Sequence, residues 1–278
     1  MNALELVVLI ALGSVVAGFL GSLTGLGGGV VIVPLLTLVF HVDIRYAIGA
    51  SLVSVIATSS GSAAAYVKEG YSNIRVGMFL EIATTIGALT GAFAAAYLRL
   101  SVIAIIFGLV LLQSAYISFR TPEDHPDSGP PDRIASLLRL DGSFPAASGP
   151  QQYRVRRVPA GFSIMYVAGV LSGLLGIGSG AVKVLAMDRA MRLPFKVSTT
   201  TSNFMIGVTA AASAGIYLNR GYIDPVLAMP VMLGVLLGSL AGTYVLARVK
   251  VPILRLVFSG VIAALGIEMV LNGFAGKF

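Results

Sequence analysis

The residue of this sequence best placed to do chemistry is a lysine inside an apolar stretch. Lys183 follows the motif GIGSG (176–180) by three residues and lies in the run AVKVLAM. In a membrane interior an ammonium group costs at least about 2.5–3.5 kcal/mol, so a charge here is a candidate ligand for an anion. Two alternatives are open: the lysine snorkels to the surface along its stem, or it pairs with Asp188 or another acid.

Two glycine-rich motifs supply a second kind of candidate site. They comprise Gly25, Gly27, Gly28 and Gly29 in the first motif, and Gly176, Gly178, Ser179 and Gly180 in the second. A glycine in a helix interior costs about 1 kcal/mol relative to alanine, so each motif predicts a break between two half-helices. The N–H groups and the positive dipole end of a half-helix can face an anion. The alternative is that the glycines only permit close helix packing.

Polar side chains at the start of two further apolar segments are candidate contacts for the same anion. They are Ser51 in AIGASLV, and Thr199 and Asn203 in STTTSNF, which share a helix face at a spacing of four. Hydroxyl and amide groups can bind an oxyanion without a fixed charge. A hydroxyl can instead bond the carbonyl of its own helix four residues earlier. For Asn203 we favour ligand binding, because its amide needs partners in an apolar setting.

The segments that must hold these residues are apolar enough to cross a membrane. The chain is 56% hydrophobic and 11% charged, whereas soluble domains have roughly 25% charged residues. Apolar runs close to the roughly 20 residues of a membrane-spanning helix recur along the chain. The N-terminus has no basic stretch before its first apolar run, which predicts a retained span and not a signal peptide. The sequence therefore predicts an all-α polytopic membrane protein.

One stretch interrupts this pattern. Residues 121–158 are rich in proline, glycine and charge, which predicts a linker between an N-terminal transmembrane repeat, 1–120, and a C-terminal one, 159–278. Within it, PDRIASLLRL favours a short amphipathic helix, and QYRVRRV alternates as a strand does. Both a small extramembrane hairpin and a disordered linker fit this composition.

The two hydrophobic halves resemble each other. When residue i is set against residue i + 151, Gly25, Gly27 and Gly29 meet Gly176, Gly178 and Gly180. One residue of slip then places Ser51 on Thr201, and the offset returns at Gly70 and Gly221. Each half has five apolar segments, which are Leu4–Leu23, Gly28–Phe40, Ala47–Tyr66, Val76–Leu98 and Val102–Phe119 in the first, and Ala160–Leu175, Gly180–Met191, Val197–Leu218, Pro225–Ala247 and Ile253–Leu271 in the second. An odd number of crossings in each half predicts two inverted-topology repeats, each with a glycine-broken pair at its start.

Basic residues orient this topology, because cytoplasmic loops are enriched in lysine and arginine. With five segments in each half, four basic residues fall on the side of the N-terminus, namely Arg45, Arg99, Arg220 and Lys277. Fourteen fall on the other side, and Lys183 lies inside a segment. In the alternative topology, the first two segments of each half form one crossing. This places ten basic residues on one side and eight on the other, which is no bias. We therefore expect both termini outside and the linker in the cytoplasm.

Inverted repeats with glycine-broken segments at matching positions are typical of secondary transporters, which bind substrate between the repeats. Glu81 and Glu268 lie inside apolar segments, and either could carry a proton, because an intramembrane carboxylate is a functional candidate. For Glu81 we favour contact with headgroups or a basic residue, since it lies about 9 Å along a helix from Arg75. An anion channel is the alternative, because the same breaks and hydroxyls would line a pore.

The paired motifs also carry a family resemblance. GLGGGVVIVP and AIGASL, repeated as GIGSGAVKV and TTTSNFMIGVTAA, resemble the TauE/SafE family of membrane permeases. The resemblance covers both hydrophobic halves and implies export of small anions, in particular sulfur oxyanions such as sulfite or organosulfonates. Other small carboxylate-type anions are the alternative substrates. Ser179 replaces a glycine of the usual pattern, and Leu185 stands where the first half has Pro34.

Several other functional classes do not fit the sequence. The chain has no cysteine, which excludes disulfides and thiolate metal sites. It has no GxxxxGK[ST] motif for ATP, and GIGSG lacks the spacing of a serine hydrolase. Membrane topology explains the net charge of +7, so no nucleic acid is expected. We expect no enzyme activity, no cofactor and no metal. The expected partners are a small anion and the lipid bilayer of the cell membrane (the inner membrane in a Gram-negative source), and a homo-oligomer is left open.

Overall fold

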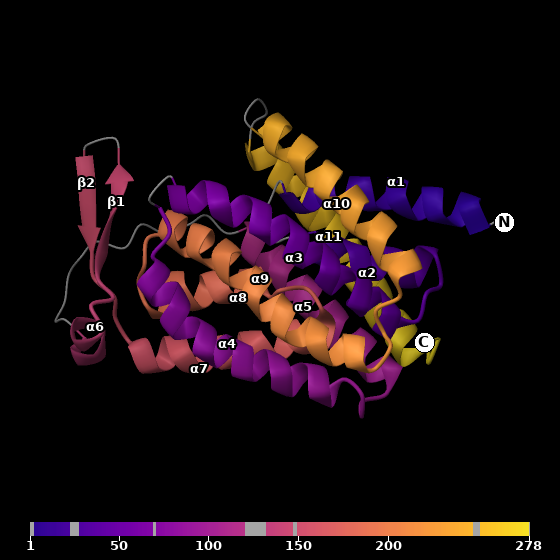
Figure 1. Ribbon diagram of the computed structural model, residues 1–278, viewed down its shortest axis with the longest axis horizontal. Coiled ribbons are helices and arrows are strands. Elements are labelled where there is room, and N and C mark those ends of the chain that lie inside the picture. Colours follow the sequence, from indigo (N-terminus) through magenta and orange to yellow (C-terminus); the bar gives the residue numbers. More distant parts are fainter. Residues whose placement is uncertain are drawn as a thin grey trace.

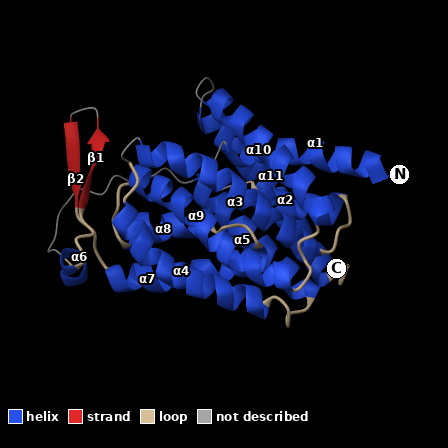
Figure 2. Cartoon of the chain, viewed as in Figure 1, coloured by secondary structure: helices blue, strands red, loops and turns tan. Residues whose placement is uncertain are grey.

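A computed structural model describes residues 3–22, 28–68, 71–119, 132–146, 149–246 and 251–277. This part of the chain is helical apart from one small hairpin (Figures 1 and 2). The first half contains α1 (Ala3–Ser22), α2 (Gly29–Pro34), the π-helix η1 (Leu35–Val39), α3 (Ile44–Lys68), α4 (Ile74–Ala94) and α5 (Leu100–Phe119). The second half contains α7 (Val158–Leu175), α8 (Gly180–Leu185), the π-helix η2 (Ala186–Ala190), α9 (Phe195–Asn219), α10 (Pro225–Leu246) and α11 (Val251–Phe274).

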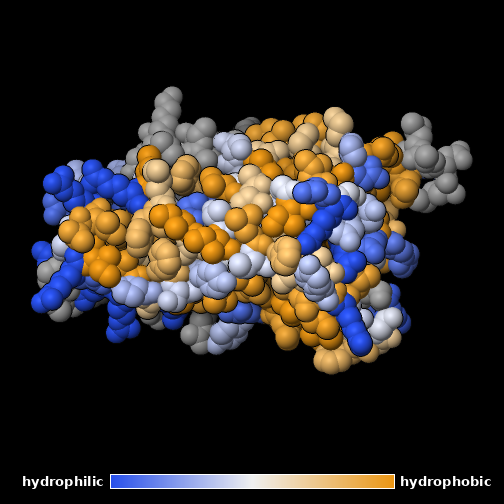
Figure 3. Space-filling model, turned by 60° about the horizontal axis from the view of Figure 1, so that its bottom comes forward, coloured by the Kyte–Doolittle hydropathy of each residue, from blue (hydrophilic) through white to orange (hydrophobic). Residues whose placement is uncertain are grey.

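The predicted all-α polytopic membrane class is confirmed. Four described helices are long and apolar enough to span a bilayer: Ile74–Ala94, Leu100–Ile117, Val158–Leu175 and Pro225–Gly242. Their outer faces carry large exposed apolar side chains, among them Met78, Phe93 and Leu237. Figure 3 shows hydrophobic surface along much of the molecule, with hydrophilic residues at its left end and a second group of them toward its right end. Such a surface is suited to lipid, because a large exposed apolar patch is rare on soluble monomers.

The helices of one half pack against helices of the other. α1 packs on α10 and α4 on α7, while α3 packs on α9 and α5 on α11. A Cβ added at Gly18 of α1 would clash with the backbone of Val235, and one added at Gly169 of α7 would clash with the backbone of Thr84. Small residues permit such close contacts between membrane helices. Gly169 lies 151 positions after Gly18, and Val235 lies 151 positions after Thr84. The two contacts are therefore equivalent in the two halves, which supports the predicted repeat.

The offset between the halves has no slip, so the expected alignment of Ser51 with Thr201 is wrong. α2 begins at Gly29 and α8 at Gly180, while α3 begins at Ile44 and α9 at Phe195. Both pairs differ by 151 residues, because connections of equal length, 40–43 and 191–194, lead into the two long helices. Ser51 therefore corresponds to Ser202. The inverted orientation of the two halves in a membrane stays a prediction.

The two termini lie at one end of the molecule, and the linker lies at the other (Figure 1). At the terminal end, Arg45 donates to the carbonyl oxygen of Leu98 at 3.2 Å, which joins the start of α3 to the α4–α5 turn. At the opposite end, the side-chain amide of Asn73 donates to the carbonyl oxygen of Leu140 at 2.8 Å. The relative positions agree with the expected topology. Which end faces the cytoplasm stays a prediction.

The described part of the linker contains a short helix and a two-stranded hairpin. α6 (Arg133–Leu137) is followed by β1 (Gly142–Ala146) and β2 (Gly149–Tyr153), which pair antiparallel with Gly142 opposite Tyr153. The strand ends at Tyr153 and does not continue through the expected alternation of QYRVRRV. Beyond Tyr153 the backbone bonds to other segments: the N–H of Val155 donates to Asp141 at 2.7 Å, and the N–H of Arg156 donates to the carbonyl of Met191 at 3.0 Å.

Candidate functional site

The second glycine motif breaks the helix as expected. α7 ends at Leu175, its C-cap Gly176 has a φ of +68°, and Gly178 and Ser179 follow with φ of +70° and +48° before α8 begins. These left-handed conformations reverse the chain and are routine for glycine, but uncommon for a residue such as Ser179. In the first half, α1 ends at Ser22 and α2 begins at Gly29. Gly25 and Gly27 lie outside the described residues.

Gly29, at the start of α2, and Gly176, at the second break, both lie against Ser51 of α3. The hydroxyl of Ser51 donates to the carbonyl oxygen of Gly176 at 2.8 Å. A Cβ added at Gly29 would lie 2.6 Å from Ser51 Oγ and 3.1 Å from the Gly176 oxygen, so Gly29 admits this approach. Gly28 faces Val235 of α10, where an added Cβ would lie 2.5 Å from a side-chain methyl. Ser51 and the glycines thus join the two halves by close packing.

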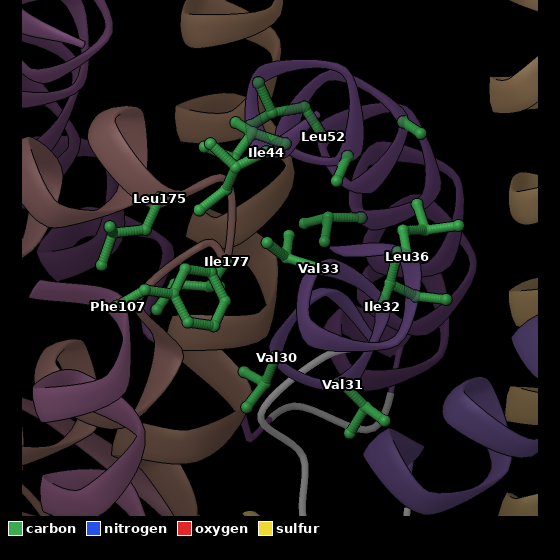
Figure 4. Packing of buried hydrophobic residues seen from close by; sticks show 14 of the residues in the cluster. Val30, Val31, Ile32, Val33, Leu36, Ile44, Leu52, Phe107, Leu175 and Ile177 are labelled. Carbon is green, nitrogen blue, oxygen red and sulfur yellow. The ribbon is translucent and has the colours of Figure 1, made fainter. Parts of the chain in front are cut away.

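Apolar side chains fill the space around the breaks. Ile177, between the two glycines of the second motif, is 2% exposed and belongs to the same hydrophobic cluster as Phe107 and Val30. Figure 4 shows Ile177 beside the Phe107 ring, with Val30 and Val33 of α2 close by. Among the described residues, the second break is therefore surrounded by packed apolar groups at Ile177.

Lys183 does not snorkel. Its side chain is fully buried, and Nζ donates to the hydroxyl oxygen of Thr209 on α9 at 2.5 Å. Thr209 Oγ1 in turn donates to Glu81 Oε1 on α4 at 2.7 Å, which is the shorter of its two acceptor distances; the other is 2.9 Å, to the Met205 carbonyl of its own helix. An ammonium and a carboxylate are thus joined through one hydroxyl, and the acid is Glu81 and not Asp188. We call Lys183, Thr209 and Glu81 the charge cluster.

Glu81 is a buried member of this cluster, not the interfacial residue that we favoured from the sequence. It is 8% exposed, and Thr85 also donates to its Oε1, at 3.3 Å. Among the described residues, Glu81 Oε2 has no hydrogen-bond partner. Burying two opposite charges removes both from water, and they compensate for that only when they remain close. The cluster therefore holds both charges in place in this conformation.

The positions that the repeat relates to the charge cluster carry no charge. The residues 151 positions away are Ile32, Thr58 and Met232, so only the threonine is shared. Ile32 is fully buried, and the hydroxyl of Thr58 donates to the carbonyl of Ser54 at 3.0 Å. Sequence analysis identified Lys183 and Glu81 separately but missed Thr209. The one available signal was a threonine at matching positions of the two long central helices.

The remaining candidates are spread over the structure. The hydroxyl of Thr199 donates to the carbonyl of Phe195 at 2.9 Å, which satisfies its own helix. Asn203 is half-buried on α9, and Ser179 Oγ is buried with no hydrogen-bond partner among the described residues. Ser202 donates to the carbonyl of Gly180 at 3.3 Å. Glu268 is exposed on α11, and no described contact joins it to the charge cluster.

Comparisons with known proteins identify what the chain is similar to. The family described as Sulfite exporter TauE/SafE matches residues 10–269. The probable membrane transporter protein YunE of Bacillus subtilis is 27% identical over 97% of this chain and 99% of its own. A probable membrane transporter protein of Xylella fastidiosa is 26% identical over 99% of this chain and 98% of its own. No solved structure gives a significant match.

Proposed function

The chain belongs to the sulfite exporter TauE/SafE family of membrane transporters, and we propose that it is a secondary transporter in which Lys183 binds a small anion. The observation that carries this proposal is the burial of the Lys183 ammonium in the charge cluster. An intramembrane charge is expensive and marks a substrate or ion pathway by default. The other half has Ile32 at the matching position, so the fold itself does not require a lysine there.

The position of Lys183 favours a carrier over a channel. Its side chain is fully buried, and Ile177 and Phe107 belong to an apolar cluster around the neighbouring break. An anion reaches the ammonium only after the helices move, as alternating access between two repeats would allow. The close α3–α9 and α4–α7 packing between the halves gives surfaces along which such a movement can occur.

The donors around Lys183 suit an oxyanion. Ser179 lies one turn before Lys183, whose N–H donates to the Ser179 carbonyl at 3.1 Å, and the Ser179 hydroxyl is buried without a partner among the described residues. Thr209 supplies a second hydroxyl at the ammonium. A compact ammonium with mobile hydroxyl donors can bind the oxygens of sulfite or of a sulfonate. The family description makes export of such sulfur oxyanions the first substrate class to test.

The test is transport by the purified protein in proteoliposomes. Uptake and efflux of sulfite, methanesulfonate, sulfoacetate and acetate are measured with and without a pH gradient. We expect saturable transport of at least one sulfur oxyanion by the wild type. Lys183→Met should abolish it while the protein stays folded in the membrane, and Lys183→Arg should retain part of it, because charge matters more here than bidentate geometry.

The matched control is Lys277→Met, because Lys277 is exposed at the C-terminal end and far from the cluster in the sequence. This variant should transport like the wild type. Wild-type rate and affinity in Lys183→Met would refute anion binding by Lys183. Large single-channel currents in planar bilayers would instead identify the alternative, an anion channel.

A further inference from the structure

The Glu81 carboxyl has one oxygen whose bonding the fold leaves incomplete. Oε1 accepts from Thr209 and Thr85, whereas Oε2 is buried and has no hydrogen-bond partner among the described residues. A buried polar atom without a partner is unfavourable, and a negatively charged one especially so. A proton on Oε2 would remove the charge, and the nearby Lys183 ammonium is the group that compensates for the charge when no proton is bound.

Charged and titratable groups lie on α4 itself, on α7 and α9, which pack against it, and on α8. On α8 the facing group is Lys183, which Thr209 joins to Glu81. The other such groups on these elements bond elsewhere: Arg75 on α4 to the Arg139 carbonyl, Tyr166 on α7 with Thr90, Lys196 on α9 over the Tyr71 ring, Tyr217 on α9 to the Leu174 carbonyl, and Arg220 on α9 over the Phe93 ring. Asp188 and Arg189 follow α8 on η2. Among the described residues, Lys183 is therefore the charged neighbour that responds to the protonation of Glu81.

The net charge of the cluster determines which combinations of bound proton and bound anion can stay buried. With Lys183 charged and Glu81 ionised, the empty cluster is neutral. A monovalent anion alone would make it negative, and a proton alone would make it positive. The two together make it neutral again. Because an uncompensated charge is strongly unfavourable in a buried site, the neutral states are the ones that can change from facing one side to facing the other.

We infer that Glu81 takes up one proton when Lys183 binds a monovalent anion, so that proton and anion cross the membrane together. This inference rests on the proposed function and adds the coupling ion. The anion replaces the Thr209 hydroxyl at the Lys183 ammonium, and a proton from the same side forms an O–H bond at Glu81 Oε2. Both leave on the opposite side. Glu81 and Lys183 then pair again through Thr209, and the neutral empty carrier returns.

The first experiment uses the wild-type protein in proteoliposomes with the membrane potential clamped by potassium and valinomycin. Methanesulfonate is the probe, because its single negative charge does not change with pH and it cannot carry the proton itself. A proton gradient directed into the vesicles should drive its accumulation, and a trapped pH dye should record one proton for each anion. Accumulation that follows the membrane potential and not the proton gradient would overturn the inference.

The second experiment separates coupling from binding. Glu81→Gln imitates the protonated carboxyl, so its anion-loaded cluster is neutral but its empty cluster is positive. We expect this variant to exchange internal for external methanesulfonate while its net uptake falls by at least about tenfold, because the empty form cannot return. Glu5→Gln is the matched control, since Glu5 is exposed in the first turn of α1, and it should keep both activities.

The results of these experiments separate failure of proton coupling from failure of the proposed transport function. Net uptake by Glu81→Gln that still follows the proton gradient would refute coupling while leaving a Lys183-dependent transporter. Absence of transport of every anion by the wild type would refute the proposed function, and the inference with it. If Glu81→Gln does not yield folded protein, the ratio of protons to anions in the wild type decides, because that measurement needs no substitution.

Discussion

Thr209 and Glu81 lie 128 residues apart in the sequence, yet the Thr209 hydroxyl donates to Glu81 Oε1 at 2.7 Å. The same hydroxyl oxygen accepts from Lys183 at 2.5 Å. One side chain of α9 thus joins a charge on α4, in the first half of the chain, to a charge on α8, in the second. Any movement that separates α4 from α8 must break this chain of hydrogen bonds, so its stability bears directly on transport.

Removing the Thr209 hydroxyl should impair transport. Thr209→Val keeps the shape of the side chain but leaves Lys183 and Glu81 without their shared partner. We expect net anion uptake to fall at least about tenfold and stability to fall by about 1–3 kcal/mol, the usual effect of an unsatisfied buried polar group. Thr209→Ser keeps the hydroxyl and should retain most activity. Uptake assays and thermal unfolding in detergent measure the two effects.

Thr58→Val provides the matched control for Thr209→Val. Thr58 occupies the same place 151 residues earlier. Both hydroxyls lie within hydrogen-bond distance of the carbonyl four residues earlier in their own helix, Ser54 for Thr58 and Met205 for Thr209, but the residues that match Lys183 and Glu81 in the repeat are the uncharged Ile32 and Met232. This variant should transport within about twofold of the wild type. Equal losses in the two variants would mean that threonine in these helices serves packing and not the charge cluster.

The orientation in the membrane can be tested by cysteine labelling, because the chain has no cysteine of its own. Ser143 is exposed on β1 of the linker, and Ala275 is exposed at the C-terminal end. Since basic residues concentrate at the linker end, we expect Ser143→Cys to resist a membrane-impermeant thiol reagent in intact cells. Ala275→Cys should react. The reverse pattern would place the linker outside and leave the fold unchanged.

Close helix contact at Gly91 should make that position intolerant of a side chain. A Cβ added at Gly91 of α4 would clash with the backbone carbonyl of Val170 on α7, whereas one added at Gly215 of α9 would meet no atom within 4 Å. We expect Gly91→Ala to lower stability by about 1–3 kcal/mol through overpacking. Gly215→Ala should be neutral or stabilising by up to about 1 kcal/mol, since alanine favours the helix. Thermal unfolding of both variants in detergent tests this difference.

Acid should loosen the attachment of α6 to α7. Although partial burial acts to raise the pKa of Asp132, backbone N–H groups of Val158, Ile134, Ala135 and Arg157 outweigh it and lower this pKa below its usual value. The stabilisation is therefore complete above the ordinary pKa of an aspartate and is lost as the pH falls through the lowered pKa. Hydrogen exchange of the α6 amides should show this loss at low pH.

Two substitutions separate titration from capping at Asp132. The carboxylate caps α6 through Ile134 at 2.8 Å and holds the start of α7 through Val158 at 3.1 Å. Asp132→Asn should keep most of the cap and remove the pH dependence, while Asp132→Ala should lose about 1 kcal/mol of helix stability at neutral pH and less at low pH, where the wild type has already lost the carboxylate. An unchanged pH profile in Asp132→Asn would assign the effect to another group.

The amino-acid sequence by itself determined the class of the fold and the place of its breaks. Long apolar segments with few charges can only span a bilayer as helices, because lipid offers no partners for free backbone groups. Gly176 and Gly178 weaken a helix whatever its tertiary contacts are. The chain reverses at these two glycines, and both have a positive φ. The equal spacing of motifs in the two halves likewise follows from the sequence alone, although the one-residue slip predicted at Ser51 was wrong.

The meeting of Lys183, Thr209 and Glu81 was decided only by the tertiary structure. Successive residues of a helix point in directions that differ by about 100°. A modest rotation of α4 about its own axis, relative to α9, would therefore point Glu81 to lipid. That rotation is set by backbone contacts such as Gly87 against Tyr166 and Gly169 against Thr84, which join segments far apart in the chain. No local pattern records these contacts. For the same reason the sequence could identify a lysine and a glutamate as candidates, but it could not tell that one threonine would lie between them.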